Sequence, residues 1–281
     1  MNADAGRVAR LALITGASSG IGAAFARNLA ATGCDLILVG RRAEALSELG
    51  GRLRDAHHID VENLVANLAT PTDLDRVEQR LSFGRRPDLL INSAGAALPG
   101  RFDAAPVGKL EELVRLQCLA PIRLTHALLP ELVRQHHGGI INVCSLEAFY
   151  PQPYHATYAA AKAFLLSWTE GLHEEMRTAG VRVVALCPGL TRSEFHHRAG
   201  LNVSMLSASL WSQPAEVAAA GLRALQKDRA VHVPGTVNAA AAAAGRLLPG
   251  AVVRRVAGRV GKRLIASASH ILRGEAHEGP V

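Results

Sequence analysis

Aromatic residues are scarce in this sequence: Phe, Trp and Tyr make up 4% of its 281 residues, whereas apolar residues make up 49%. The interior must therefore be filled mostly by Ala, Leu and Val, which is typical of a buried parallel sheet flanked by alanine-rich helices. Apolar content at this level argues against disorder. The length suits one α/β core followed by a tail.

Cysteine is also rare, and no pair has the C-x-x-C spacing of a redox or zinc site. We interpret the four cysteines as free buried thiols in a reducing compartment. Long apolar runs are missing as well. None reaches membrane-spanning length without a charge or a proline, and the run LALITGA near the start is too short for a signal peptide. We therefore expect a cytoplasmic protein.

Acidic residues are few near the C-terminus. Residues 231–281 contain seven Lys/Arg against two Glu, a net charge of +5, whereas the whole chain carries +7. The basic character thus describes the tail more than the core, and nucleic-acid binding is not implied.

Short runs of β-branched and leucine residues alternate with helical stretches. This alternation predicts a doubly wound, Rossmann-like parallel sheet with helices on both faces. Ligands bind beyond the carboxyl ends of strands in such sheets. The expected strands are Val8–Thr15, Asp35–Val39, Asn63–Ala66, Asp88–Ile91, Gly139–Cys144, Val181–Leu186 and, more weakly, Val231–Val233.

A glycine-rich turn, TGASSGIG, joins the first strand to an alanine-rich helix. Gly16, Gly20 and Gly22 permit a tight turn and let a pyrophosphate approach the N–H groups at the positive end of the helix. The position of this turn between strand and helix predicts a dinucleotide site. We assign residues 1–234 to a dinucleotide-binding catalytic domain.

The second strand ends in Gly40, Arg41 and Arg42, where a carboxylate would normally hold the ribose hydroxyls of NAD. A guanidinium at this place attracts a 2′-phosphate, so the sequence favours NADP over NAD. The alternative is that the two arginines only solvate the start of a helix.

These motifs resemble the short-chain dehydrogenase/reductase family over residues 8–233. The resemblance is carried by five signatures in the family's order: TGASSGIG (15–22), NSAG (92–95), Ser145, YAAAK (158–162) and PGLTRS (188–193).

The resemblance implies a role for each matching residue. The pyrophosphate and nicotinamide side would be lined by Gly16, Ser18, Gly20, Ile21 and Gly22. The adenine and its ribose would contact Asn67, Leu68, Asn92, Ala94 and Gly95. The carboxamide would be held by Pro188, Gly189 and Thr191, with Ser193 at the family's usual threonine position. Asn67 replaces a usual acidic residue and can still accept a hydrogen bond from the adenine amine.

Tyr158 is the expected proton donor in this resemblance, with Lys162 one helical turn away on the same face. A nearby cation favours the phenolate, so we expect Lys162 to lower the pKa of Tyr158. Ser145 would donate a second hydrogen bond to the substrate oxygen. We interpret Tyr150 and Tyr154 as walls of the substrate mouth, the alternative being ordinary surface aromatics.

Gln117 stands where the family usually has an asparagine that bends a long helix and holds a water beside the lysine. Glutamine carries the same polar groups one methylene further out, so the relay could survive, shift or fail. We expect NADPH-dependent reduction of a ketone or aldehyde, reversible to alcohol oxidation, on a fairly apolar substrate. The alternative is an inactive dinucleotide sensor or scaffold.

Three segments lie outside these motifs. Residues 191–213 are irregular and predict a substrate lid, with His196–His197 inside it; no histidine pair has metal-ligand spacing, so we expect no metal. Residues 235–281 predict a basic amphipathic helical extension, with Val253, Val256, Val260 and Leu264 opposite Arg254, Arg255, Arg259 and Lys262. This extension would either touch a membrane surface or pack on the core or a sister subunit. A homo-oligomer is expected by analogy with the family.

Overall fold

The computed structural model describes residues 8–195, 199, 207 and 210–266. Seven strands form one sheet in the order β3-β2-β1-β4-β5-β6-β7, and every neighbouring pair is parallel. The strands are β1 (Leu11–Thr15), β2 (Asp35–Gly40), β3 (Val61–Val65), β4 (Leu89–Asn92), β5 (Gly139–Val143), β6 (Arg182–Leu186) and β7 (Val231–His232). The sequence thus predicted the sheet within a few residues at each strand.

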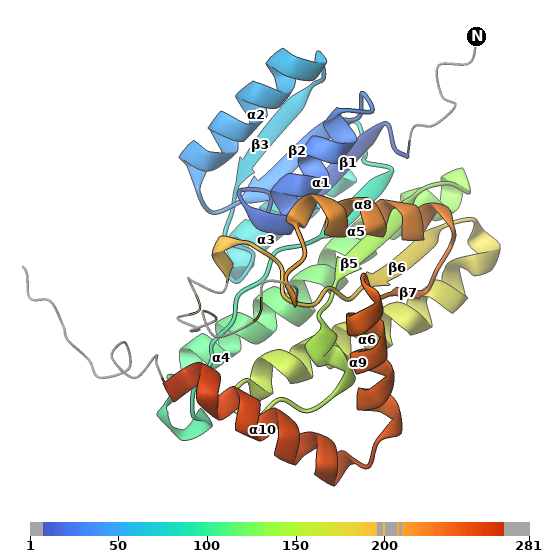
Figure 1. Cartoon of the computed structure of the whole chain (residues 1–281). Coiled ribbons are helices and arrows are strands. Elements are labelled where there is room, and N and C mark those ends of the chain that lie inside the picture. Colours follow the sequence, from blue (N-terminus) through green and yellow to red (C-terminus); the bar gives the residue numbers. More distant parts are fainter. Residues whose placement is uncertain (1–7, 196–198, 200–206, 208–209, 267–281) are drawn as a thin grey trace, which may run out of the picture.

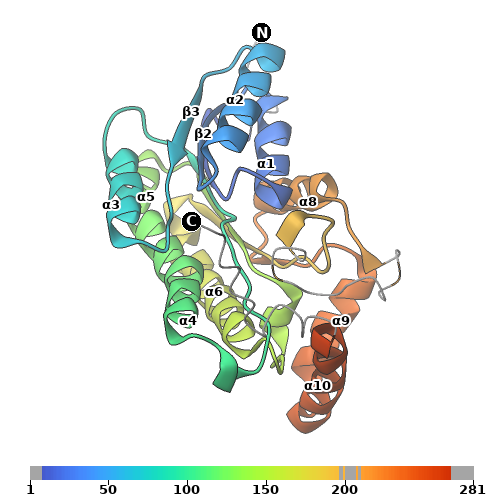
Figure 2. The same ribbon diagram turned by 90° about the vertical axis from the view of Figure 1, so that its left-hand side faces the viewer.

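Helices cover both faces of the sheet, as predicted (Figures 1 and 2). One face is covered by α1 (Gly20–Ala30), α2 (Ala43–His57) and α8 (Pro214–Gln226), which pack Phe25, Leu46 and Val217 against it. The other face is covered by α3 (Pro71–Ser82), α5 (Ala120–Gln135) and α6 (Ala156–Met176), which contribute Leu74, Leu124 and Leu172. Both sides of the sheet are therefore dry, which explains its nearly continuous apolar strands.

The helix before α5 contains an irregularity that the sequence did not predict. Between α4 (Val107–Val114) and α5 the chain forms a π-helical turn, η2 (Arg115–Leu119), and Gln117 lies at its centre. Such single turns are rare inside α-helices and often occur at functional sites. The irregularity thus lies in the backbone hydrogen-bond pattern of this segment.

Two helices follow β7: α9 (Thr236–Leu247) and α10 (Gly250–Ala266). In α9, the Arg246 guanidinium lies 4.9 Å from the ring centroid of Phe149 and forms an ion pair with Glu170 at 3.2 Å. Further on, α10 packs against the segment before α6, where Gly258 and Gly261 approach Pro153. The extension is therefore held against the catalytic region.

The side of α10 that packs on the core differs from our expectation. Small residues, Ala257 and Gly261, are its buried positions, whereas Val256 and Val260 are exposed. Small residues occupy the side that faces the core because they let the helix backbone come close to Pro153. Val253, which we expected on the same side as Val256 and Val260, is half-buried. The side chain of Leu264 lies outside the described residues.

Candidate active site

A cavity of about 700 Å³ opens at the carboxyl ends of the central strands. Its wall contains nearly all the residues that the motifs predicted for the cofactor and the chemistry. They are Gly16, Ser18, Gly20, Ile21, Gly22, Arg41, Asn67, Leu68, Ala94, Gly95, Ser145, Tyr158, Lys162, Pro188, Gly189 and Thr191. Among the residues assigned to the cofactor and the chemistry, Asn92 and Gln117 lie outside this wall.

The glycine-rich turn is closely packed, and side chains would not fit it. Gly16 adopts φ +67°, and a Cβ there would lie 2.8 Å from Cα of Ala94. A Cβ on Gly22 would overlap the carbonyl oxygen of Gly16. Glycine is therefore required at these positions, and the start of α1 remains open to an anionic group.

Thr15 fixes this turn against the neighbouring loop, a role that we did not predict. Its hydroxyl accepts hydrogen bonds from the N–H groups of Ser93 and Ala94, both at 3.0 Å. It is fully buried at the end of β1. The signal in the sequence that could have revealed this role is the position of Thr15 directly before Gly16.

The two arginines after β2 have different surroundings. Arg42 donates a hydrogen bond to the Ser18 carbonyl at 2.9 Å and forms an ion pair with Glu194 at 3.2 Å. Arg41 is exposed on the cavity wall and has no hydrogen bond or ion pair with any residue that the structure describes. Arg42 thus braces the glycine-rich turn, and Arg41 is the cation open to a ligand.

Asn67 and Leu68 line the adenine end of the cavity. The Asn67 N–H donates to the Asp73 carboxylate at 2.7 Å, and the Asn67 side-chain oxygen accepts from the Ala69 N–H at 3.3 Å. The oxygen keeps a second lone pair, so it retains the acceptor capacity that we predicted.

Asn92 differs from its expected place beside the adenine ribose. It is buried below the cavity wall, where its amide nitrogen donates to the Asn142 oxygen at 2.8 Å. Asn142 in turn donates to the Thr169 hydroxyl at 2.9 Å. Asn92 is the last residue of β4, and its amide nitrogen also lies 3.5 Å from the Thr125 hydroxyl of α5, so its side chain ties the ends of β4 and β5 together.

Tyr158 and Lys162 lie on the buried side of α6, one turn apart as predicted. The helix begins at Ala156, so Tyr150 and Tyr154 precede it, in keeping with the two prolines there. The Lys162 ammonium donates to the Val143 carbonyl at 2.8 Å and lies 5.7 Å from the centroid of the Tyr158 ring. Ser145, at the end of β5, is in the same wall.

The acidity of Tyr158 differs from our expectation. Burial raises the pKa of the Tyr158 phenol, the Glu147 carboxylate raises it further, and a hydrogen bond with Ser145 opposes both. Burial likewise lowers the pKa of Lys162. Desolvation is the main influence on both groups and disfavours their charged forms, because both side chains are buried. The phenol is held in its neutral, proton-carrying form.

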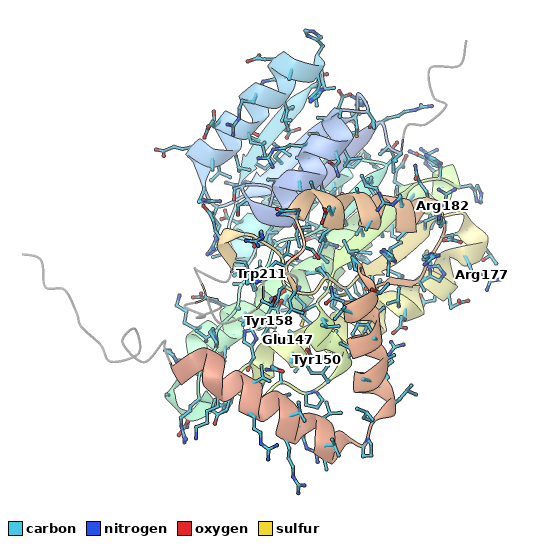
Figure 3. All side chains as sticks on the ribbon, viewed as in Figure 1. Glu147, Tyr150, Tyr158, Arg177, Arg182 and Trp211 are labelled. Atoms are coloured by element: carbon cyan, nitrogen blue, oxygen red, sulfur yellow. The ribbon has the colours of Figure 1, made fainter. Side chains whose placement is uncertain are left out.

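Glu147 and His155 form a pair beside Tyr158 that the motifs did not reveal. The Nδ1 atom of His155 is 2.8 Å from a Glu147 carboxylate oxygen, and the imidazole stacks on the Tyr158 ring at 4.5 Å. The Glu147 N–H also donates to the Ser145 hydroxyl at 3.1 Å. Figure 3 labels Glu147, Tyr150 and Tyr158 close together beneath α8. The pair therefore contacts both residues expected to touch the substrate oxygen.

Gln117 is fully buried in the π-helical turn and faces the loop after β4. Its amide nitrogen donates to the Ala96 carbonyl at 2.7 Å. The amide oxygen has no hydrogen-bond partner among the described residues. A buried acceptor of this kind suits a bound water.

The two other tyrosines occupy different cavities. Tyr150 lines the main cavity, where burial raises the pKa of its phenol to about 12. Tyr154 adopts φ +66° and lines a second cavity of about 570 Å³ next to α10. Only Tyr150 is thus where we expected both to be, because Pro153 and the turn at Tyr154 carry the chain out of the main cavity.

Within the predicted lid, residues 191–213, the structure describes residues 191–195, 199, 207 and 210–213. The two ends of this segment are tied together: the Ser212 N–H donates to the Leu190 carbonyl at 2.9 Å, and the Arg192 N–H donates to the Ser212 carbonyl at 3.0 Å. The Phe195 ring lies 5.9 Å from the Tyr158 ring, between centroids. His196 and His197 lie outside the described residues. Within the described part of the chain, no group of three potential metal ligands occurs.

Comparison with known proteins agrees with this architecture. The family model described as short chain dehydrogenase matches residues 10–204. A short-chain dehydrogenase from Sphingobium yanoikuyae, solved in complex with NADPH, is 34% identical, with 96% of this chain and 98% of that chain covered and a TM-score of 0.76. A bulky-bulky ketone specific alcohol dehydrogenase from Comamonas testosteroni is 27% identical, with 96% and 97% covered and a TM-score of 0.72.

Among curated relatives, a very-long-chain 3-oxoacyl-CoA reductase from Pyrenophora tritici-repentis is 35% identical over 177 residues. These are 61% of this chain and 52% of that protein. The parallel sheet, the glycine-rich turn and the Tyr–Lys pair on one cavity wall define an NAD(P)-dependent oxidoreductase. The chain belongs to the short-chain dehydrogenase/reductase family.

Proposed function

We propose that this enzyme uses NADPH to reduce a ketone or aldehyde to an alcohol, reversibly, with Tyr158 as the general acid. The observation that carries the proposal is the position of Tyr158, Lys162 and Ser145 on the same cavity wall as the glycine-rich turn. A dinucleotide lying along that turn would present its reactive ring on the side of the cavity where the phenol lies.

The residues of the cavity fit an NADP molecule. The turn has no side chains that would block a pyrophosphate, and Arg41 is an exposed guanidinium at the ribose end. Arg41 would hold the 2′-phosphate, because a guanidinium pairs well with phosphate oxygens. When bound, the cofactor supplies the hydride. The NADPH complex of the Sphingobium relative supports this choice of cofactor.

Tyr158 would give its proton to the oxygen of the substrate carbonyl. Because burial raises the pKa of its phenol, the proton is present at neutral pH before reduction begins. The Ser145 hydroxyl would donate a second hydrogen bond to the same oxygen. The Lys162 ammonium, which donates to the Val143 carbonyl, lies next to the Tyr158 ring. The three residues thus supply the proton and a hydrogen-bonding environment for the negative charge that develops on oxygen.

A fairly apolar substrate suits the part of the wall near Tyr158. Ala97 and Phe195 pack beside Tyr158, and Leu146 and Tyr150 line the same cavity. Apolar lining with a few placed polar groups is the usual composition of a small-molecule site. The names of the Comamonas and Pyrenophora relatives, which specify a bulky ketone and a very long acyl chain, agree with this class.

The decisive experiment is Tyr158→Phe, assayed by NADPH consumption across carbonyl compounds graded by chain length and ring size. Turnover should fall on the order of 10²- to 10⁴-fold, the usual contribution of a general acid. NADPH binding, followed by fluorescence, should stay close to that of the native enzyme. Native turnover in the variant would refute the assignment of Tyr158.

The competing function is a dinucleotide sensor that kept the fold and lost turnover. Gln117 in place of the usual asparagine is the observation that favours it. Replacement by asparagine and by alanine separates the two functions: Gln117→Asn should retain activity and Gln117→Ala should lower it. No carbonyl compound consuming NADPH with the native enzyme would favour the sensor.

Subunit number and cellular location stay predictions: a homo-oligomer in the cytoplasm, with membrane-surface contact through the extension as an alternative mode of association. In the described residues, no helix is both long enough and apolar enough to cross a bilayer.

A further inference from the structure

Helix α10 presents an apolar ridge that no described residue covers. Val252, Val256 and Val260 recur every fourth residue, so they share one side of the helix. Their exposed fractions are 48%, 54% and 45%. An adjacent side of α10, through Ala257 and Gly261, packs on the core. Among the described residues, the ridge is therefore not part of the packed core.

Exposed leucines precede α10. Leu247, the last residue of α9, and Leu248, in the turn that follows, are exposed, and Leu247, at 83%, is the most exposed large apolar residue of the described chain. Six of the fourteen exposed large apolar residues lie between Val237 and Val260. Apolar exposure concentrated in this way marks a surface that binds a partner.

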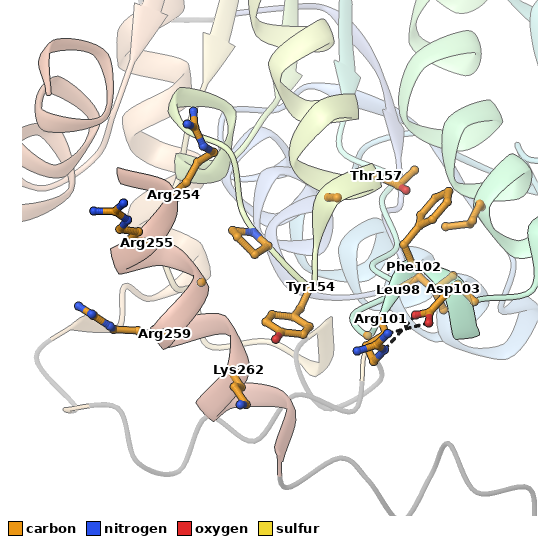
Figure 4. A pocket seen from close by; sticks show the side chains of 16 residues that line it. Leu98, Arg101, Phe102, Asp103, Tyr154, Thr157, Arg254, Arg255, Arg259 and Lys262 are labelled. Carbon is orange, nitrogen blue, oxygen red and sulfur yellow. Dashed lines mark hydrogen bonds and ion pairs between the residues drawn. The ribbon is translucent and has the colours of Figure 1, made fainter. Parts of the chain in front are cut away.

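The charge beside the ridge has one sign. The basic side chains of α10 include Arg255, Arg259 and Lys262, and residues 250–266 contain no Asp or Glu. Arg254, Arg255 and Arg259 project from one side of α10, away from the Arg101–Asp103 ion pair (Figure 4). None of the four, Arg254, Arg255, Arg259 and Lys262, forms an ion pair with any described residue. Their charge is therefore available to an anionic partner.

We propose that α10 docks on the surface of a membrane containing anionic phospholipid. The valine ridge would enter the boundary between headgroups and acyl chains, and the flanking guanidinium groups would meet phosphates. A second copy of the chain fits less well, because a two-fold interface would set one uniformly basic helix against another. This proposal goes beyond the carbonyl reductase function and does not depend on it.

Docking would bring the substrate side of the main cavity close to the membrane. The inner side of α10 contacts Pro153 and Tyr154, directly before the helix that carries Tyr158. The cavity between α10 and Tyr154 also faces the basic side of the helix. The membrane would thus lie close to the substrate side of the enzyme, where a lipid-soluble carbonyl compound could enter.

Sedimentation of the full chain with vesicles tests the proposal. Vesicles of phosphatidylcholine mixed with phosphatidylglycerol should sediment the protein, and this binding should weaken as salt is raised. Vesicles of phosphatidylcholine alone should sediment far less of it. Failure to bind the anionic vesicles at low salt would overturn the proposal.

Two sets of variants locate the surface. The triple variant Val252→Ser, Val256→Ser and Val260→Ser should lose vesicle binding, while Phe83→Ser, an exposed apolar residue on another part of the surface, should not. Retained NADPH binding would show that the triple variant is folded. Native vesicle affinity in the triple variant would refute the valine ridge as the inserted surface.

The second set of variants tests the charge. The test variant combines Arg255→Gln with Arg259→Gln, and the control variant combines Arg177→Gln with Arg182→Gln. Arg177 and Arg182 are exposed and lie at the far side of the molecule from α10 (Figure 3). Because each basic residue near an anionic surface is worth about fivefold in affinity, the α10 pair should lose roughly 20- to 30-fold and the control pair little. Equal losses would show that net charge alone causes binding.

Light scattering after gel filtration distinguishes membrane docking from an interface with a second copy of the chain. The number of subunits should be the same in the native enzyme and in the triple serine variant. A lower number in the variant would assign the ridge to a subunit interface and overturn membrane docking.

Discussion

The nucleotide side of the cleft and its substrate side are built in different ways. On the nucleotide side, the site is formed mainly by the backbone. Glycines follow the end of β1, the Thr15 hydroxyl holds the loop after β4, and N–H groups are open at the start of α1. On the substrate side, buried side chains prevail, and their effect depends on neighbours from η3 (Leu146–Phe149), α6 and α9. Motifs describe the first kind of site well and the second kind poorly.

The largest effect should come from filling the nucleotide side. In Gly22→Val, the side chain would overlap the Gly16 carbonyl, so the turn must shift. We expect loss of NADPH binding in a fluorescence titration and a loss of about 1–3 kcal/mol in the free energy of unfolding. The matched helical control is Gly51→Ala, where a Cβ meets nothing within 4 Å. That variant should be neutral or more stable by about 0.5–1 kcal/mol. Similar behaviour in both variants would contradict the close packing of the turn.

The two arginines after β2 should give a different pair of results. Arg41→Asp should raise KM for NADPH on the order of tenfold or more and leave KM for NADH nearly unchanged, because only the 2′-phosphate is lost as a partner. Arg42→Gln should weaken both cofactors, since Arg42 also holds Ser18. Initial-rate kinetics with both cofactors measure this. An unchanged cofactor ratio in Arg41→Asp would remove Arg41 from the phosphate site.

On the substrate side, Glu147→Gln tests the electrostatics of Tyr158. Alcohol oxidation needs the phenolate, so its rate should rise with pH towards the raised pKa of Tyr158, whereas reduction uses the neutral phenol and should fall there. The charged or polar groups around the phenol are Glu147, Ser145, Lys162, Cys144 and the stacked imidazole of His155. Removing the Glu147 carboxylate removes a charge that disfavours the phenolate.

The oxidation profile of Glu147→Gln should therefore move to lower pH. The glutamine retains a hydrogen-bonding oxygen for His155, so the geometry of the pair is largely kept. The measurement is kcat for oxidation as a function of pH, with Glu174→Gln as an exposed control. A profile that stays in place, or moves to higher pH, would exclude this influence of Glu147.

The smallest effect should come from the contact between α10 and the segment before α6. In Gly261→Ala, the added Cβ would lie 2.7 Å from the Pro153 carbonyl oxygen, whereas in Gly258→Ala the nearest atom is at 3.4 Å. Thermal unfolding should show a loss of about 1 kcal/mol for the first and almost none for the second. Turnover should change little in either. A strong loss of turnover in Gly261→Ala would mean that α10 positions the catalytic residues.

Much of the fold could be predicted because the signals are local. Each strand is a short apolar run, and the glycine turn occurs between a strand and a helix. The π-helical turn at Gln117 could not be predicted, because the segment LVRLQCLAP has ordinary helical residues and the shift in hydrogen bonding depends on tertiary contacts. The same holds for Asn92, whose motif indicated a ligand contact and whose neighbours Asn142 and Thr169 bury it instead.

The sequence by itself determined the parallel sheet, the place of the dinucleotide turn and the helical spacing of Tyr158 and Lys162, since each follows from backbone requirements of a few adjacent residues. Tertiary structure alone decided the acidity of the phenol, the Glu147–His155 pair against it and the side of α10 that faces outward. These depend on how deeply a group is enclosed and what lies across from it, and both are set by segments far apart in the chain.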